Sequence, residues 1–167
     1  KYRWMKRLIT GILALCWMVL IGSFSAQSGR ESGSLSRAVA DKVISVQEYI
    51  TGETYSRQER EARIEALQFP VRKLAHMSEY GVLAILIAFH FGTYLFAAGR
   101  PGLRLFLAWF AATVYAAADE IHQLFVPGRS GQFTDVCIDA AGALLGVLVF
   151  WGIVVLLERK KLQRKKA

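Results

Sequence analysis

The stretch that decides the fold carries no charge, and it reads LITGILALCWMVLIGSF from Leu8 to Phe24. It is about as long as the shortest helix that crosses roughly 30 Å of hydrocarbon. Lys6 and Arg7 precede it and small serines follow it, as in a secretory signal peptide. The apolar region of a signal peptide is usually only about 7 to 15 residues long, so we favour a retained membrane anchor.

Three further apolar stretches of about 20 residues or more follow this one. The four expected spans cover about residues 8–24, 74–98, 103–124 and 136–157. The composition agrees, because 54% of the 167 residues are hydrophobic and only 20% are charged. The sequence therefore predicts an all-α polytopic membrane protein in which residues 1–167 form one domain, a bundle of four transmembrane helices.

The distribution of Lys and Arg predicts how the spans are oriented. Twelve basic residues, opposed only by Glu158, lie before the first span, between the second and third, and after the fourth. The loop 25–73 instead carries eight basic and seven acidic residues. Because loops rich in Lys and Arg stay in the cytoplasm, we expect both termini to be cytoplasmic and the loop 25–73 to be extracytoplasmic. The net charge of +8 is therefore explained by basic residues that flank the membrane spans, and no nucleic-acid partner is expected.

The loop 25–73 is expected to be helical in two parts. Apolar residues recur at intervals of three and four, at Leu35, Val39, Val43, Val46 and Ile50. Such a stripe predicts an amphipathic helix, which would lie on the membrane surface or cap the bundle.

The second part of the loop begins with a capping-box spacing, Ser56 and Glu59. This spacing predicts a charged helix that continues to about Gln68. Pro70 is then expected to end that helix and to start the second span, because proline is favoured at the first turn of a helix.

Ionisable residues inside or beside the spans are costly, and their positions are therefore informative. The second span opens, the third closes and the fourth opens with such residues: Lys73, His76, Glu79 and Tyr80; Asp119, Glu120, His122 and Gln123; Asp135 and Asp139. In the expected topology all three groups fall at the outer end. With Gln27 after the first span and Arg129 in the turn before the fourth, they predict a polar pocket open to the outside.

The first functional hypothesis is that this pocket binds or processes an anionic molecule. Lys73, Arg129 and a protonated His76 would hold phosphate or carboxylate groups of a lipid-linked or surface molecule. The full set of candidate ligand-binding residues is Gln27, Lys73, His76, Tyr80, Asp119, Glu120, Gln123, Arg129, Asp135 and Asp139. The expected partners are membrane lipids and, among them, a lipid-linked cell-wall precursor.

A membrane-embedded hydrolase or transferase is the second hypothesis. His76 would act as a general base oriented by Asp119 or Asp135, so the catalytic candidates are His76, Asp119, Glu120 and Asp135. A metal-assisted version would use the oxygen-rich set His76, Glu79, Glu120 and Asp135 or Asp139, which suits Mg, Mn or Zn. The sequence contains no H-E-x-x-H motif and identifies no cofactor. A third hypothesis is a structural or assembly protein whose polar residues only tie helices together.

Taken together, these motifs resemble the VanZ-like family of small bacterial membrane proteins, named for a protein associated with teicoplanin resistance. The resemblance rests on three pieces that are preceded by Ser25-x-Gln27-Ser28: Lys73-x-x-His76-x-x-x-Tyr80; Asp119-Glu120-x-x-Gln123 followed by Pro127-Gly128-Arg129; and Asp135-x-x-x-Asp139-x-x-Gly142-x-x-x-Gly146. The family often has Asn where this chain has Asp139. The resemblance implies a multi-pass protein of the bacterial cytoplasmic membrane, linked to glycopeptide sensitivity.

The topology is tested by labelling single cysteines with a membrane-impermeant thiol reagent. In a background lacking Cys16 and Cys137, intact cells should label a cysteine placed at Gly52 but not one placed at Gln163. Labelling of position 163 alone would invert the predicted orientation.

Overall fold

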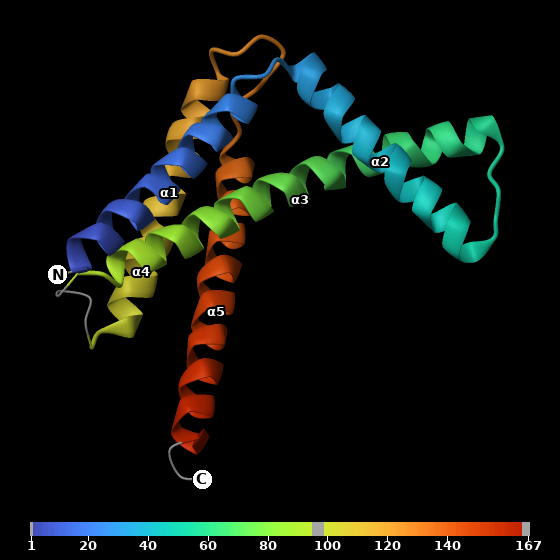
Figure 1. The fold of residues 1–167 in the computed structure, drawn as a ribbon. Coiled ribbons are helices and arrows are strands. Elements are labelled where there is room, and N and C mark those ends of the chain that lie inside the picture. Colours follow the sequence, from blue (N-terminus) through green and yellow to red (C-terminus); the bar gives the residue numbers. More distant parts are fainter. Residues whose placement is uncertain (1, 95–98, 165–167) are drawn as a thin grey trace.

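The computed structural model describes residues 2–94 and 99–164, and this part of the chain consists of helices without strands (Figure 1). The helices are α1 (Arg3–Ser25), α2 (Gly29–Thr51), α3 (Arg57–Phe91), α4 (Pro101–Gln123) and α5 (Phe133–Arg164). All of them except α2 are long and apolar enough to cross a membrane, which confirms the all-α fold with four candidate spans. The last part of the second expected span, residues 95–98, lies outside the described residues.

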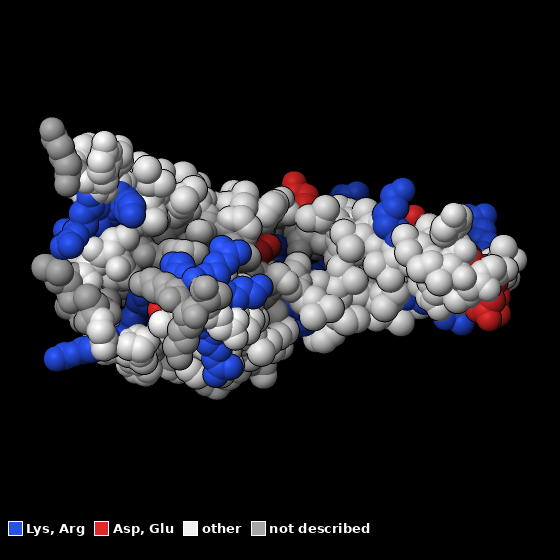
Figure 2. Space-filling view, turned by 60° about the horizontal axis from the view of Figure 1, so that its bottom comes forward, with Lys and Arg blue, Asp and Glu red and all other residues white. Residues whose placement is uncertain are grey.

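At one end of the bundle lie the ionisable residues that the sequence places at the ends of the spans. There α1 and α4 end and α5 begins, and we call this the polar end (Figure 1). At the opposite end α1 and α4 begin and α5 ends, near the chain termini. Basic side chains gather at this opposite end (Figure 2). The part of the molecule farthest from the bundle, where α2 ends and α3 begins (Figure 1), carries both acidic and basic side chains (Figure 2).

The helix α2 and residues 57–69 of α3 form an antiparallel hairpin, the arm, that projects sideways from the bundle (Figure 1). Capping boxes at Ser28 and Ser56 start the two helices; the one at Ser56 was predicted, and the one at Ser28 was not. At Ser28, hydrogen bonds from its hydroxyl and backbone N–H lower the pKa of the Glu31 carboxyl.

The arm buries a different face of α2 from the one that the sequence indicated. Ser36, Ala40 and Ile44 are buried, with Ala40 and Ile44 packed against Ile64 of α3. The predicted apolar stripe remains exposed, with exposed fractions between 45% at Val43 and 76% at Ile50. Small side chains at positions 36 and 40 let the two helices approach closely, so α2 lies along α3 and does not cap the bundle.

The expectation that Pro70 ends a helix is wrong. α3 runs without interruption through 35 residues, and Pro70 lies inside it. A proline there removes one backbone hydrogen bond. The carbonyl that loses its donor is that of Ala66, which is exposed, so water can satisfy it and the helix continues into the bundle.

The helices α3 and α5 run in the same general direction through the bundle and cross at very close range (Figure 1). A Cβ atom added at Gly142 would be 2.3 Å from the backbone oxygen of Met77, and one at Gly146 would be 2.2 Å from that of Gly81. The Gly142-x-x-x-Gly146 spacing was interpreted as a close-packing motif, and the structure confirms this. The motif is used inside the bundle.

Aromatic side chains link the other helices through hydrogen bonds to backbone carbonyls. The indole of Trp17 on α1 donates to the Glu79 carbonyl of α3 at 2.9 Å, and that of Trp109 on α4 donates to the Ala140 carbonyl of α5 at 3.1 Å. The Tyr115 hydroxyl of α4 donates to the Met18 carbonyl of α1 at 2.7 Å. These hydrogen bonds hold α1 beside α3 and α4, and α4 beside α5, in the arrangement that positions the polar end.

The glycine crossing predicts a position-specific cost of adding one methyl group. Gly146→Ala should lower stability by about 1–3 kcal/mol, because the new Cβ collides with backbone that cannot move aside. Thermal unfolding in detergent measures this change. The matched control is Gly152→Ala on the same helix, where an added Cβ meets nothing within 4 Å. Equal melting temperatures for the two variants would contradict the close crossing.

Candidate functional site

Helix α3 supplies the largest share of the polar side chains at the polar end. Arg72, Lys73, His76, Glu79 and Tyr80 follow one another at helical spacing, so they occupy one side of α3 over about two turns. α3 enters the bundle as an unbroken helix, so these residues are held on a rigid element.

An ion pair joins α3 to the start of α5. The Lys73 ammonium pairs with the Asp135 carboxylate, and both side chains are largely buried, with exposed fractions of 18% and 22%. Asp135 lies in the first turn of α5, where the positive end of the helix dipole also favours a carboxylate.

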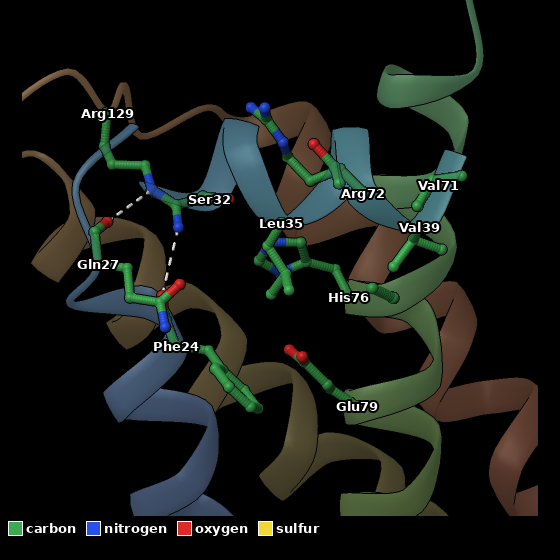
Figure 3. Close-up of a pocket in the computed structure, with 12 residues that line it drawn as sticks. Phe24, Gln27, Ser32, Leu35, Val39, Val71, Arg72, His76, Glu79 and Arg129 are labelled. Carbon is green, nitrogen blue, oxygen red and sulfur yellow. Dashed lines mark hydrogen bonds between the residues drawn. The ribbon is translucent and has the colours of Figure 1, made fainter. Parts of the chain in front are cut away.

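Arg129 closes the end of α1. Its Nε donates to the Gln27 carbonyl at 3.1 Å and its Nη2 donates to the Phe24 carbonyl at 3.3 Å (Figure 3). The turn carrying Arg129 is held in place because the Gly29 amide donates to the Pro127 carbonyl at 3.1 Å. A side chain at Gly29 would collide with Gly128, since its Cβ would lie 2.0 Å from the Gly128 oxygen.

Arg72 is a member of the site that the sequence analysis missed. Its Nε atom is buried and has no hydrogen-bond partner among the described residues. The signal was available, because Arg72 lies four residues before His76 and therefore on the same side of α3. It was only counted among the eight basic residues of the loop 25–73.

These residues surround a cavity of about 280 Å³, which we call the polar cavity. The chemistry-bearing groups on its wall come from α3, the end of α4, the following turn and the start of α5. They are Arg72, Lys73, His76, Gln123, Arg129, Ser130, Gln132, Thr134 and Asp135. The structure thus brings together five of the predicted site residues, Lys73, His76, Gln123, Arg129 and Asp135.

The remaining predicted acids lie deeper and are not among the residues that line the polar cavity. Asp119 accepts a hydrogen bond from the Gln123 amide at 3.2 Å, and Glu120 accepts one from the Gln132 backbone N–H at 2.9 Å. Asp119, Glu120 and Asp139 are all at least 95% buried. They lie there because α4 ends and α5 begins beside α3, so their side chains point into the helix interface.

Arg72 Nε is one of several buried polar atoms without a hydrogen-bond partner in the described part of the chain, and two others lie among the deep residues of the site. Asp139 Oδ1 and the Tyr80 hydroxyl have no hydrogen-bond partner among the described residues. Both lie within electrostatic range of Asp119.

The catalytic and metal-ligand hypotheses stay predictions, and the structure shows only how far apart or unconnected their described residues are. Among residues 2–94 and 99–164, no hydrogen bond between His76 and Asp119 or Asp135 is present to orient the imidazole. No three His, Cys, Asp or Glu side chains in those ranges are arranged to hold a metal ion. The set His76, Glu79, Glu120 and Asp135 is therefore dispersed, with Glu79 on the opposite side of His76 from Asp135.

Comparison with known proteins gives one match. A family model described as VanZ/LLP1 matches residues 10–157, which is most of the chain. No curated protein and no solved structure matches.

The Lys73–Asp135 pair predicts a rescue between two variants. Lys73→Met should destabilise the protein by about 1–3 kcal/mol, because it leaves a largely buried carboxylate unpaired. Adding Asp135→Asn should restore most of the loss, as measured by thermal unfolding of the purified protein. If the double variant is as unstable as Lys73→Met alone, the two side chains do not stabilise each other.

Proposed function

The chain belongs to the VanZ/LLP1 family, and on that basis we propose that it is a bacterial cytoplasmic-membrane protein with both termini in the cytoplasm and its polar end outside. The charge distribution supports this orientation. Basic side chains gather at the end of the bundle near the termini (Figure 2), where the rule for cytoplasmic loops expects them.

The proposed activity is binding of an anionic group, a phosphate or a carboxylate, that belongs to a lipid-linked or other cell-envelope molecule. The observation that carries this proposal is a pair of arginines, Arg72 and Arg129, on the wall of one cavity. In the described ranges neither arginine forms an ion pair with a carboxylate, whereas Lys73 does.

The electrostatics of the two arginines favour an anion between them. Burial and then the nearby charge of Arg72 lower the pKa of the Arg129 guanidinium, and they outweigh the opposing effect of Asp119, Glu120 and Glu79. The direction shows that the surroundings disfavour the cation, although a guanidinium stays charged at all physiological pH values. A phosphate or carboxylate would relieve this cost and offer each guanidinium two acceptor oxygens.

An association with glycopeptide resistance is consistent with the family name. Glycopeptides act on cell-wall precursors at the outer surface, and a protein that holds the anionic part of such a precursor there would change its accessibility. We propose this as the link to teicoplanin resistance, with the precursor as the partner.

Arg72→Gln should weaken binding of an anionic lipid at least about tenfold, because it removes a charge-assisted, bidentate donor. The measurement compares dihexanoyl phosphatidic acid with dihexanoyl phosphatidylcholine by calorimetry on the purified protein. Arg30→Gln is the matched control, since it removes the same charge from an exposed position outside the cavities.

Arg72 is preferred to Arg129 for this test because Arg129 also holds the end of α1. In a glycopeptide-susceptible host, expression of the natural chain should raise the teicoplanin concentration that stops growth, and Arg72→Gln should abolish that increase. Equal binding of phosphatidic acid by Arg72→Gln and Arg30→Gln would favour a purely structural protein.

A further inference from the structure

A second cavity, of about 200 Å³, lies between the end of α1, the start of α2 and α3 (Figure 3). We call it the side cavity. It shares Arg72, His76 and Arg129 with the polar cavity, so the same groups separate the two spaces. Its other polar side chains are Gln27, Ser32, Ser36 and Glu79.

The rest of the side cavity is hydrocarbon. Phe24 of α1, Leu35 and Val39 of α2, and Val71 and Ala75 of α3 form its apolar wall. A space with charged groups at one edge and an apolar wall matches an amphiphile better than it matches a small hydrated ion, because apolar surface gains by leaving water.

The apolar wall does not stop at the cavity. Leu35 and Val39 are also the first members of the exposed stripe on α2, which continues along the arm through Val43, Val46 and Ile50. α2 begins at Gly29, four residues after α1 ends at Ser25. Since α1 is a candidate membrane span, the start of α2 is confined to the membrane surface, and its stripe has lipid chains within reach.

We infer that the side cavity holds part of a hydrocarbon chain of the ligand, whose phosphate headgroup lies beside Arg72 and Arg129, so that the ligand enters sideways from the membrane between α1 and α2. This inference rests on the proposed anion site and adds where the hydrocarbon chain of a lipid or lipid-linked phosphate lies and from which side it enters. A water-soluble phosphate would occupy only the polar cavity.

The test uses methyl, butyl and octyl phosphate, which carry the same headgroup and differ in chain length. For the unmodified protein, the affinity for the alkyl phosphate should rise about fourfold for each methylene group that the side cavity buries. The paired change Leu35→Asn and Val39→Asn should reduce octyl phosphate affinity at least about tenfold and leave methyl phosphate affinity unchanged.

The matched control is the paired change Val43→Asn and Val46→Asn, on the same stripe but outside the cavity. Both variants replace exposed residues, and retained methyl phosphate binding shows that each variant is folded. The control should show the natural dependence on chain length.

The outcomes separate this inference from the proposed function. If methyl phosphate binds to the unmodified protein but a longer alkyl chain does not raise the affinity, the side cavity holds no hydrocarbon chain. The proposed anion site would be unaffected by that result. Equal chain-length dependence in the two paired variants would place the chain elsewhere and also overturn the inference. If none of the three phosphates binds, both proposals fail.

Discussion

The rest of the polar end depends on the close crossing of α3 and α5. Gly142 and Gly146 lie against the backbone of α3 at Met77 and Gly81, so the register of the two crossing helices is fixed to within one turn. One turn earlier on α3, Lys73 arrives beside the first turn of α5 and pairs with Asp135. A slip of one helical turn would separate that pair, so the register decides which charges are neutralised and which remain free.

The features that follow from local sequence or from the membrane could be predicted. Apolar length gave the four candidate spans, the Ser56 capping box gave the start of α3, and the glycine spacing gave a close helix contact. The gathering of polar residues at one end followed from span direction alone. Each of these depends on a few neighbouring residues, or on a rule that every spanning helix obeys.

The features that depend on partners could not be predicted from the pattern. The buried face of α2 is set by Ala40 and Ile44, which meet α3, and not by the more apolar stripe beside them. Pro70 continues a helix because water can reach the carbonyl that it leaves free. Arg72 was only counted among the basic residues of the loop, because charge alone does not show which long side chain folds back onto a cavity.

The uninterrupted length of α3 has a mechanical consequence. At about 1.5 Å per residue its 35 residues measure about 52 Å, well beyond the roughly 30 Å of a bilayer's hydrocarbon. The additional length is residues 57–69, the part of α3 that belongs to the arm. The same continuous helix joins these residues to the part of α3 that lies in the bundle. Because one continuous helix carries both parts, no joint separates them, and the direction of the arm follows the direction of the spanning part of α3.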